Sequence, residues 1–335
     1  MKKNRILVTG ASGFVGKFLI KKLLRNENNT IVALYNNSIV ADLNSDLNSD
    51  FNSQISWVKV DLFSDNVSDI LLDIDIVYHL AGYSSMGSTT KELNLLNKVN
   101  VIATQRLANA CKSLSIKHFI FVSSVAVCES SADLIINEKN GLPLTPYGKS
   151  KKKAEELLIG ASKGHYNVTI LRPTALFGEY HKGSVYEMVK KIQEKRFVKF
   201  GPGNSLTNFY YIKDFVNLLV HVCCNKSTYN QVFIVSDSPY ELNIVVDWIL
   251  HCLNYKNRIL QFPIWFGYIL ATFFEFISFL INKPLLFSYR RLHAMTNKTL
   301  FSNNKISKVV DMNCKYGVHK GLIRTIKWYK KTGIL

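Results

Sequence analysis

A glycine-rich turn near the N-terminus places the strongest constraint on how this chain can fold. The run Arg5–Thr9 has the length and composition of a buried parallel strand, and residues 18–24 carry apolar side chains at helical spacing. Between them lies TGASGFVG, in which Gly10 permits a tight turn, Gly13 lets the backbone approach a pyrophosphate and Gly16 lets helix and strand pack closely. The helix N-terminus would present N–H groups to the phosphates. This order predicts a dinucleotide site.

Further strand-like runs follow at 30–35, 56–60, 74–80, 118–122 and 168–172, with helical segments between several of them. This alternation predicts an α/β protein with a Rossmann-type, doubly wound parallel sheet. The polar stretch 36–52 is predicted to be a loop. We expect a dinucleotide-binding domain over residues 1–172 with return segments near 208–236, and a smaller substrate lobe over 173–335.

The net charge of +18 is concentrated in the second half of the chain. Residues 1–150 hold 15 basic and 13 acidic residues, whereas the remainder holds 27 and 11. This distribution indicates an anionic partner for the second half. Because the basic residues are dispersed and no nucleic-acid motif accompanies them, a diphosphate-bearing substrate or an anionic membrane surface fits better than nucleic acid.

The six cysteines form no CxxC pair and no Cys/His spacing typical of a metal site. They are predicted to be reduced thiols, and no metal is expected. The chain enters an apolar strand by Ile6 without a secretory signal, so a cytoplasmic location is expected.

The glycine spacing resembles that of the extended short-chain dehydrogenase/reductases, a family of nucleotide-sugar epimerases and dehydratases. Asp61 and Leu62 resemble the family's residue pair after the third strand. The residues HLAG at 79–82 resemble the family's segment under the cofactor. Asn100 resembles a helix asparagine that supports the active site in the family. The resemblance covers nearly the whole chain. It implies cofactor contacts by Gly10, Ser12, Gly13, Phe14, Val15, Gly16, Tyr35, Asp61, Leu62, Leu80, Ala81, Gly82, Asn100, Ser123, Tyr147, Lys151 and Pro173.

The cofactor expected in this site is NAD, with NADP as the open alternative. Family members that use NAD carry an acid at the end of the second strand, and NADP users carry a nearby Arg. Here Tyr35, Asn36 and Asn37 occupy this region. The absence of a cation to neutralise a ribose phosphate favours NAD.

The pentapeptide YGKSK places Tyr147 and Lys151 four residues apart, on one face of a predicted helix that begins near Pro146. A phenol of ordinary pKa near 10 is a poor base at neutral pH. An adjacent ammonium and a nicotinamide charge would lower that pKa, so that Tyr147 could take a proton from a substrate hydroxyl. The resemblance implies that Ser124, after the fifth strand, holds the same oxygen. Ser124, Tyr147 and Lys151 are the predicted catalytic residues.

The segment Phe177–Phe215 resembles a bacterial branch of the family that works in O-antigen and related lipopolysaccharide assembly, including enzymes that epimerise N-acetylglucosamine at C4 on undecaprenyl diphosphate. Thr207 stands where several nucleotide-sugar enzymes carry an Arg that binds the diphosphate, so other cations, Lys199 among them, would have to bind it. Substrate contacts are predicted for Ser84, Ser124, Ala175, Lys182, Arg196, Thr207, Arg290 and Arg291.

The most apolar stretch, 264–281, is about long enough to reach across a bilayer. Its acid Glu275 would cost about 3 kcal/mol there, against roughly −0.5 kcal/mol for each strongly apolar residue, so crossing is marginal. Two interpretations remain open. The segment is an interfacial helix on an anionic leaflet, or it is a core or dimer-interface helix of the substrate lobe.

These observations together predict an NAD(P)-dependent C4 epimerase of an N-acetylhexosamine carried on a nucleotide or polyprenyl diphosphate. The enzyme is expected to be a cytoplasmic homodimer, or peripheral on the inner face of the cytoplasmic membrane. A 4-keto-sugar reductase would use the same three catalytic residues, and a non-catalytic cofactor-binding protein is the alternative from another class. A dehydratase is disfavoured, because Val125 and Ala126 stand where the family's dehydratases carry Asp and Glu.

Overall fold

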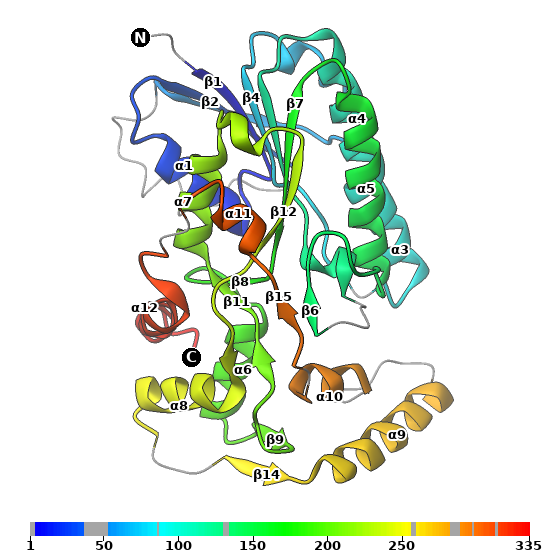
Figure 1. Ribbon diagram of the computed structural model, residues 1–335, viewed down its shortest axis with the longest axis vertical. Coiled ribbons are helices and arrows are strands. Elements are labelled where there is room, and N and C mark those ends of the chain that lie inside the picture. The colour runs from blue at the N-terminus through cyan, green and yellow to red at the C-terminus, as the bar shows by residue number, and fades with distance from the viewer. Residues whose placement is uncertain are drawn as a thin grey trace.

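Seven parallel strands form the central sheet of the computed structural model, which describes residues 4–36, 53–85, 87–129, 134–255, 259–281, 289–296, 298–311 and 314–335 (Figure 1). The strand order is β12-β7-β5-β4-β1-β2-β3. The bounds are β1 Asn4–Thr9, β2 Asn29–Tyr35, β3 Ile55–Lys59, β4 Ile76–His79, β5 His118–Val122, β7 Asn167–Pro173 and β12 Gln231–Val235.

The order reverses between β1 and β4, and ligands of such sheets bind outside the carboxyl ends of the strands at this point. The predicted α/β class and Rossmann-type sheet are therefore confirmed. The fourth strand is shorter than predicted, because the N–H of Ile74 bonds to Leu71 in a turn instead of to a neighbouring strand. Most of the predicted loop, residues 37–52, lies outside the described residues.

Helices cover both faces of the sheet (Figure 1). One face carries α1 (Phe14–Leu23) and α7 (Ile212–Val222), and the other carries α3 (Thr90–Leu96), α4 (Ala103–Ala110) and α5 (Pro146–Ser162). Successive side chains of β1 point to opposite faces, so Ile6 and Val8 join the core under α1 and α7 while Leu7 joins the core under α4 and α5. The apolar run at the N-terminus is thus buried on both sides.

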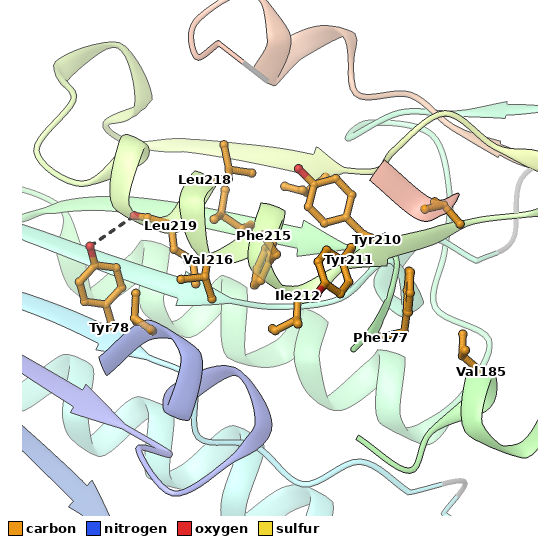
Figure 2. Packing of buried hydrophobic residues seen from close by; sticks show 14 of the residues in the cluster. Tyr78, Phe177, Val185, Tyr210, Tyr211, Ile212, Phe215, Val216, Leu218 and Leu219 are labelled. Carbon is orange, nitrogen blue, oxygen red and sulfur yellow. Dashed lines mark hydrogen bonds between the residues drawn. The ribbon is translucent and has the colours of Figure 1, made fainter. Parts of the chain in front are cut away.

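The core between the sheet and α7 is rich in aromatic side chains (Figure 2). Phe215 and Leu219 of α7 are fully buried, and the phenol of Tyr78 on β4 donates a hydrogen bond of 3.3 Å to the carbonyl of Leu219. This bond fixes the last turns of α7 against the centre of the sheet.

The second half of the chain adds a lobe of short elements beyond the carboxyl ends of the strands (Figure 1). α7 and β12 lie within 208–236 and return the chain to the sheet region, whereas the domain boundary at residue 172 stays a prediction. The lobe and its connections contain β6 Ile135–Ile136, β8 Ala175–Phe177, α6 Ser184–Gln193, β9 Val198–Phe200, β10 Leu206–Thr207, β11 Phe209–Tyr211, β13 Tyr240–Glu241, α8 Leu242–Leu253, β14 Leu260–Phe262, α9 Ile264–Ile281, α10 Tyr289–Thr296, β15 Leu300–Phe301, α11 Asn304–Ser307 and α12 Gly317–Lys331.

Candidate active site

The glycine turn after β1 packs too closely for side chains at two positions. Gly10 has a φ of +66°, and a Cβ there would lie 2.8 Å from the backbone nitrogen of Ala81. A Cβ on Gly16 would lie 2.4 Å from the carbonyl oxygen of Gly10. The turn is therefore held against α1, as the sequence predicts for Gly16, and also against the segment after β4.

α1 begins directly after this turn, with Gly13 as its N-cap and Phe14, Val15 and Gly16 as its first residues. No side chain among the described residues caps the helix, so its first N–H groups and positive dipole end face the turn. Ser12 is half-buried beside them. This geometry suits a pyrophosphate, which needs backbone donors and no competing side chain.

Two buried hydroxyls at the ends of β5 and β7 also fit a bound dinucleotide. The Oγ of Ser123 and the Oγ1 of Thr174 have no hydrogen-bond partner among the described residues, although both residues are at least nine-tenths buried. Such an unmade bond costs about 1–3 kcal/mol, which a ligand that supplies the missing partner would recover. Pro173 lies between Thr174 and the rest of β7.

A series of hydrogen-bonded side chains fixes the backbone of residues 79–82, the segment expected to lie under the cofactor. Thr104 donates a hydrogen bond to the carbonyl of Asn100 at 2.7 Å, so it accepts one from Nε2 of His79 at 2.9 Å. Nδ1 of His79 therefore accepts from Thr9 at 2.7 Å, and Thr9 in turn accepts from the N–H of Ala81 at 3.2 Å. Burial lowers the pKa of His79 to about 3, so the ring is neutral, as this chain requires.

Asn100 occupies the π-helical turn Asn97–Ile102, a rare conformation that is frequent at functional sites. Its amide accepts a hydrogen bond from the N–H of Tyr83 at 2.8 Å and donates to the carbonyl of Tyr83 and to Oγ of Ser150, both at 2.9 Å. The side chain thus joins the segment after β4 to α5. The supporting role that the resemblance implies agrees with these contacts.

α5 starts where the sequence predicts, with Pro146 in its first turn and the side chain of Thr145 accepting from the N–H of Gly148. One turn into the helix, Nζ of Lys151 donates to the carbonyl of Val122 at 2.8 Å and lies 4.3 Å from the ring centre of Phe121. The lysine is therefore tied to the last residues of β5.

Tyr147 and Ser124 interact at the same edge. Ser124 caps the turn Val125–Cys128 by accepting from the N–H of Ala126 at 3.2 Å. Burial raises the pKa of Tyr147, and hydrogen bonding with Ser124 opposes that rise. Burial also lowers the pKa of Lys151 to about 8. In the protein alone the phenol is therefore protonated at neutral pH, and the lowered pKa expected for Tyr147 stays a prediction.

The sequence interpretation missed an ion pair directly behind Lys151. Glu155 and Arg172 form two hydrogen bonds of 2.9 and 2.6 Å, and both side chains are almost fully buried. Glu155 lies one helical turn beyond Lys151, and its charge raises the pKa of Lys151 against the effect of burial. The available signal was an acid at position i+4 from the lysine, which places it on the same buried face.

The residues predicted around the adenosine lie at the ends of β2 and β3. The ring of Tyr35 packs edge-on to Trp57 at 6.4 Å, and the carboxylate of Asp61 accepts from the N–H of Phe63 at 3.0 Å. Leu62 is buried next to them. At the end of β4, Leu80 continues the pairing with β1 through a bond of its N–H to the carbonyl of Thr9. Gly82 is exposed, and a Cβ there would lie 3.7 Å from Nζ of Lys151.

The predicted substrate residues are not all placed together. The N–H of Ala175 on β8 bonds to the carbonyl of Asn208, the residue after Thr207, but β8 pairs with β11 whereas Thr207 lies on β10, which pairs with β13. The hydroxyl of Thr207 donates to the carbonyl of Tyr240 at 2.9 Å. Ser84 and Ala175 are exposed. These positions leave Ala175, Ser84 and Thr207 as predictions for substrate contact.

The basic side chains predicted to bind the substrate diphosphate each interact with a different neighbour. Arg196 pairs with Glu194 at 3.4 Å, Lys182 lies 6.0 Å from the ring centre of Tyr186, and Lys199 donates to the side chain of Asn243 at 2.6 Å. The side chains of Arg290 and Arg291 lie outside the described residues. Sequence analysis missed two buried polar atoms next in sequence to Ala175 and Thr207. These are the Oγ1 of Thr174 and the Oδ1 of Asn208, and neither has a hydrogen-bond partner among the described residues.

The fold and these residues define a nicotinamide-dependent enzyme of the extended short-chain dehydrogenase/reductase type. Residues 6–235 match the model of the NAD dependent epimerase/dehydratase family. The chain therefore belongs to that family, and its cofactor is NAD.

Known proteins resemble the chain along nearly its full length. It is 27% identical to the N-acetyl-alpha-D-glucosaminyl-diphospho-ditrans,octacis-undecaprenol 4-epimerase of Escherichia coli O157:H7, over 97% of this chain and 95% of that protein. A UDP-glucuronic acid 4-epimerase from Bacillus cereus, solved with NAD, superimposes with a TM-score of 0.78 at 22% identity, covering 98% and 99% of the two chains. A UDP-N-acetylglucosamine 4-epimerase from Methanobrevibacter ruminantium M1 gives a TM-score of 0.76 at 22% identity, covering 99% and 100%.

Proposed function

We propose that this chain is a sugar 4-epimerase in which Tyr147 exchanges a proton with the C4 hydroxyl of its substrate. The observation that supports the proposal is the hydrogen bond between Tyr147 and Ser124, just after β5, together with the bond from Lys151 on the same helix to the carbonyl of Val122, the last residue of β5. A non-catalytic cofactor-binding protein would not need these contacts.

The side chains divide the work of proton transfer. Tyr147 takes the proton of the C4 hydroxyl and later returns it, while Ser124 holds the same oxygen by a hydrogen bond. Lys151, oriented by the carbonyl of Val122, favours the phenolate of Tyr147 by its charge. Bound NAD would supply the reversible hydride acceptor that lets C4 pass through a ketone and regain hydrogen on its other face.

We assign the substrate to the N-acetylhexosamines carried on a nucleotide or polyprenyl diphosphate, in surface-polysaccharide (O-antigen) assembly. The undecaprenol-linked activity named for the Escherichia coli relative and the coverage of almost both whole chains support this class. Thr207, whose hydroxyl already bonds to Tyr240, supplies no charge for a diphosphate, so the anion would have to be bound by other groups.

We further propose that the enzyme works at the inner face of the cytoplasmic membrane and that α9 touches the lipid. Trp265, Ile269, Phe273, Phe276 and Leu280 recur every three or four residues and are 57–64% exposed, so they form one apolar stripe. Among the described side chains of α9, those that pack on the lobe lie on the opposite side, such as Ala271, which is fully buried. Figure 1 shows α9 at the end of the molecule farthest from the N-terminus.

The exposed stripe favours an interfacial helix over a core helix, and the basic second half suits an anionic leaflet. Glu275, the acid that opposes insertion, accepts a hydrogen bond from the N–H of Tyr289 at 3.0 Å, at the start of α10. None of the described helices combines the length and hydropathy that crossing a bilayer requires. The homodimer predicted from the resemblance would be compatible with contact between α9 and the membrane.

A redox balance tests the proposed reaction. Purified protein with NAD is incubated with UDP-N-acetylglucosamine and, separately, with undecaprenyl-diphosphate N-acetylglucosamine, and the products are separated by sugar chromatography while NADH absorbance is followed. An epimerase gives the C4 epimer with no sustained change in absorbance. A sustained rise in NADH absorbance with net oxidation of the sugar would instead identify a 4-keto-sugar reductase running in reverse, and no product with either carrier would remove the proposed substrate class.

A further inference from the structure

Three atoms suited to a soft metal ion lie close together at the amino-terminal end of β5, whereas the proposed catalytic residues lie at its carboxyl end. They belong to His118, the first residue of β5, to Cys223, which follows α7, and to Cys224. The two sulfur atoms are 3.8 Å apart, and a ring nitrogen of His118 lies within 4.8 Å of both. Because β5 rises about 3.3 Å per residue, this cluster is roughly 13 Å from Val122, and the mechanism does not use it.

The hydrogen bonds of His118 fix which nitrogen can bind a metal. Thr169 donates to the carbonyl of Thr228 at 2.7 Å, so it accepts from Nε2 of His118 at 2.8 Å. Nδ1 therefore carries the lone pair and accepts from the N–H of Cys224 at 3.0 Å. Metal-binding histidines usually donate their other N–H to a protein oxygen in this way.

The spacing of the two sulfur atoms suits a shared cation. With Zn–S bonds of about 2.3 Å, sulfur atoms separated by 3.8 Å subtend an angle of about 111° at the metal, which is close to tetrahedral. A disulfide would need them about 2.0 Å apart. Cys224 has a φ of +55°, a left-handed conformation that non-glycine residues rarely adopt and that is enriched at functional sites.

The cluster is open to solvent at Cys224 and buried at His118. Cys224 is exposed, whereas His118 is fully buried beneath the ring of Tyr229, whose centre is 4.7 Å away. Lys117, which precedes His118, pairs with Asp75 at 2.7 Å.

We propose that Nδ1 of His118 and the sulfur atoms of Cys223 and Cys224 bind Zn²⁺, with water as the fourth ligand. Binding displaces the N–H of Cys224 from Nδ1 toward solvent and releases the thiol protons. The metal would fasten the end of α7 to the start of β5, and it has no part in the sugar reaction. The sequence interpretation expects no metal, because His118 and Cys224 are 106 residues apart and only the sheet brings them together.

Cobalt(II) provides the test, because thiolate–cobalt bonds give an intense near-ultraviolet charge-transfer absorption. Full-length protein, purified under reducing conditions and stripped of metal, is titrated with Co²⁺ and the absorbance recorded. We expect one equivalent to saturate the band, and Zn²⁺ to abolish it. Cys224→Ser should lose the band, whereas Cys252→Ser, a control on α8, should keep it.

Thermal unfolding gives a second readout that does not depend on cobalt. Zn²⁺ should raise the Tm of wild type and Cys252→Ser by roughly 3 °C or more, and that of Cys224→Ser by much less. Melting curves without metal show whether each variant folds. A wild type that gives no charge-transfer band, or a Cys224→Ser variant that binds Co²⁺ as wild type does, would overturn the proposal.

Discussion

The Nζ of Lys151 donates a hydrogen bond to the backbone carbonyl of Val122 at 2.8 Å, and this bond links the catalytic helix to the last residue of β5. Ser123 and Ser124 follow Val122 directly, so the position of the lysine and that of the serines are set by one contact. Tyr147 lies one turn earlier on α5 and shares this alignment. The three proposed catalytic groups are therefore held by the same pair of elements, α5 and β5.

Replacing Tyr147 by Phe removes the group that exchanges the proton and leaves the ring packing nearly unchanged. We expect kcat to fall by about 10²- to 10⁴-fold, with NAD still bound. Steady-state kinetics and mass spectrometry of the copurified cofactor measure the two quantities. Full activity in this variant would contradict the role given to the phenol.

Glu155→Gln should shift the alkaline limb of the pH profile to lower pH. Burial lowers the pKa of Lys151 to about 8 and the charge of Glu155 raises it, so loss of that charge lowers it further. The ammonium form is then lost at lower pH, and activity falls with it. Profiles of kcat/KM between pH 6 and 10 measure the shift.

Glu156→Gln is the matched control for this shift, since Glu156 is the exposed neighbour on the same helix. It should leave the pH profile unchanged. Because the Glu155→Gln substitution leaves Arg172 buried without its carboxylate, melting curves of both variants must accompany the kinetics. An unshifted alkaline limb in a folded Glu155→Gln protein would refute the electrostatic role.

Gly16→Ala should abolish NAD binding and destabilise the fold. The added methyl group would meet the carbonyl oxygen of Gly10 at 2.4 Å, so the helix would have to move away from the turn. Gly160→Ala in α5 is the control, because a Cβ there meets nothing within 4 Å and should stabilise the helix by about 0.5–1 kcal/mol. Chemical denaturation and NAD titration compare the two variants.

Phe273→Glu should release the protein from lipid vesicles. The side chain is 57% exposed in the middle of the apolar stripe, and a charge there would have to enter the interface. Flotation with phosphatidylglycerol-containing vesicles at low and high salt measures binding. Leu72→Glu, at an exposed apolar residue outside α9, should float as wild type does. Wild-type protein that never floats would remove the membrane proposal.

The sequence predicts most of the sheet, the glycine turn and the start of α5, because these depend on local patterns, whereas the catalytic roles stay predictions. Buried parallel strands need continuous apolar runs, the turn needs glycines at fixed spacing, and residues four apart on a helix share a face. Pro146 therefore marks the start of α5 as expected, and the structure adds Thr145 as its N-cap.

The remaining features depend on contacts between distant segments. The partners of His79, the pairing of Glu155 with Arg172 and the meeting of His118 with Cys224 all join residues from separate elements. Nor does hydropathy show which face of α9 is covered, because that depends on how α10 and β9 pack on it. The substrate cations stay predictions for the same reason.

The neutral ring of His79 has a consequence for behaviour in acid. Its pKa is lowered from 6.5 to about 3 in the folded protein, so below pH 6.5 the unfolded chain takes up a proton that the native state refuses. Between pH 6.5 and about 3, the free energy of unfolding should then decrease by about 1.4 kcal/mol for each pH unit that the medium falls. Mild acidification would thus lower the stability of the fold through His79, a buried residue that has no part in the proposed reaction.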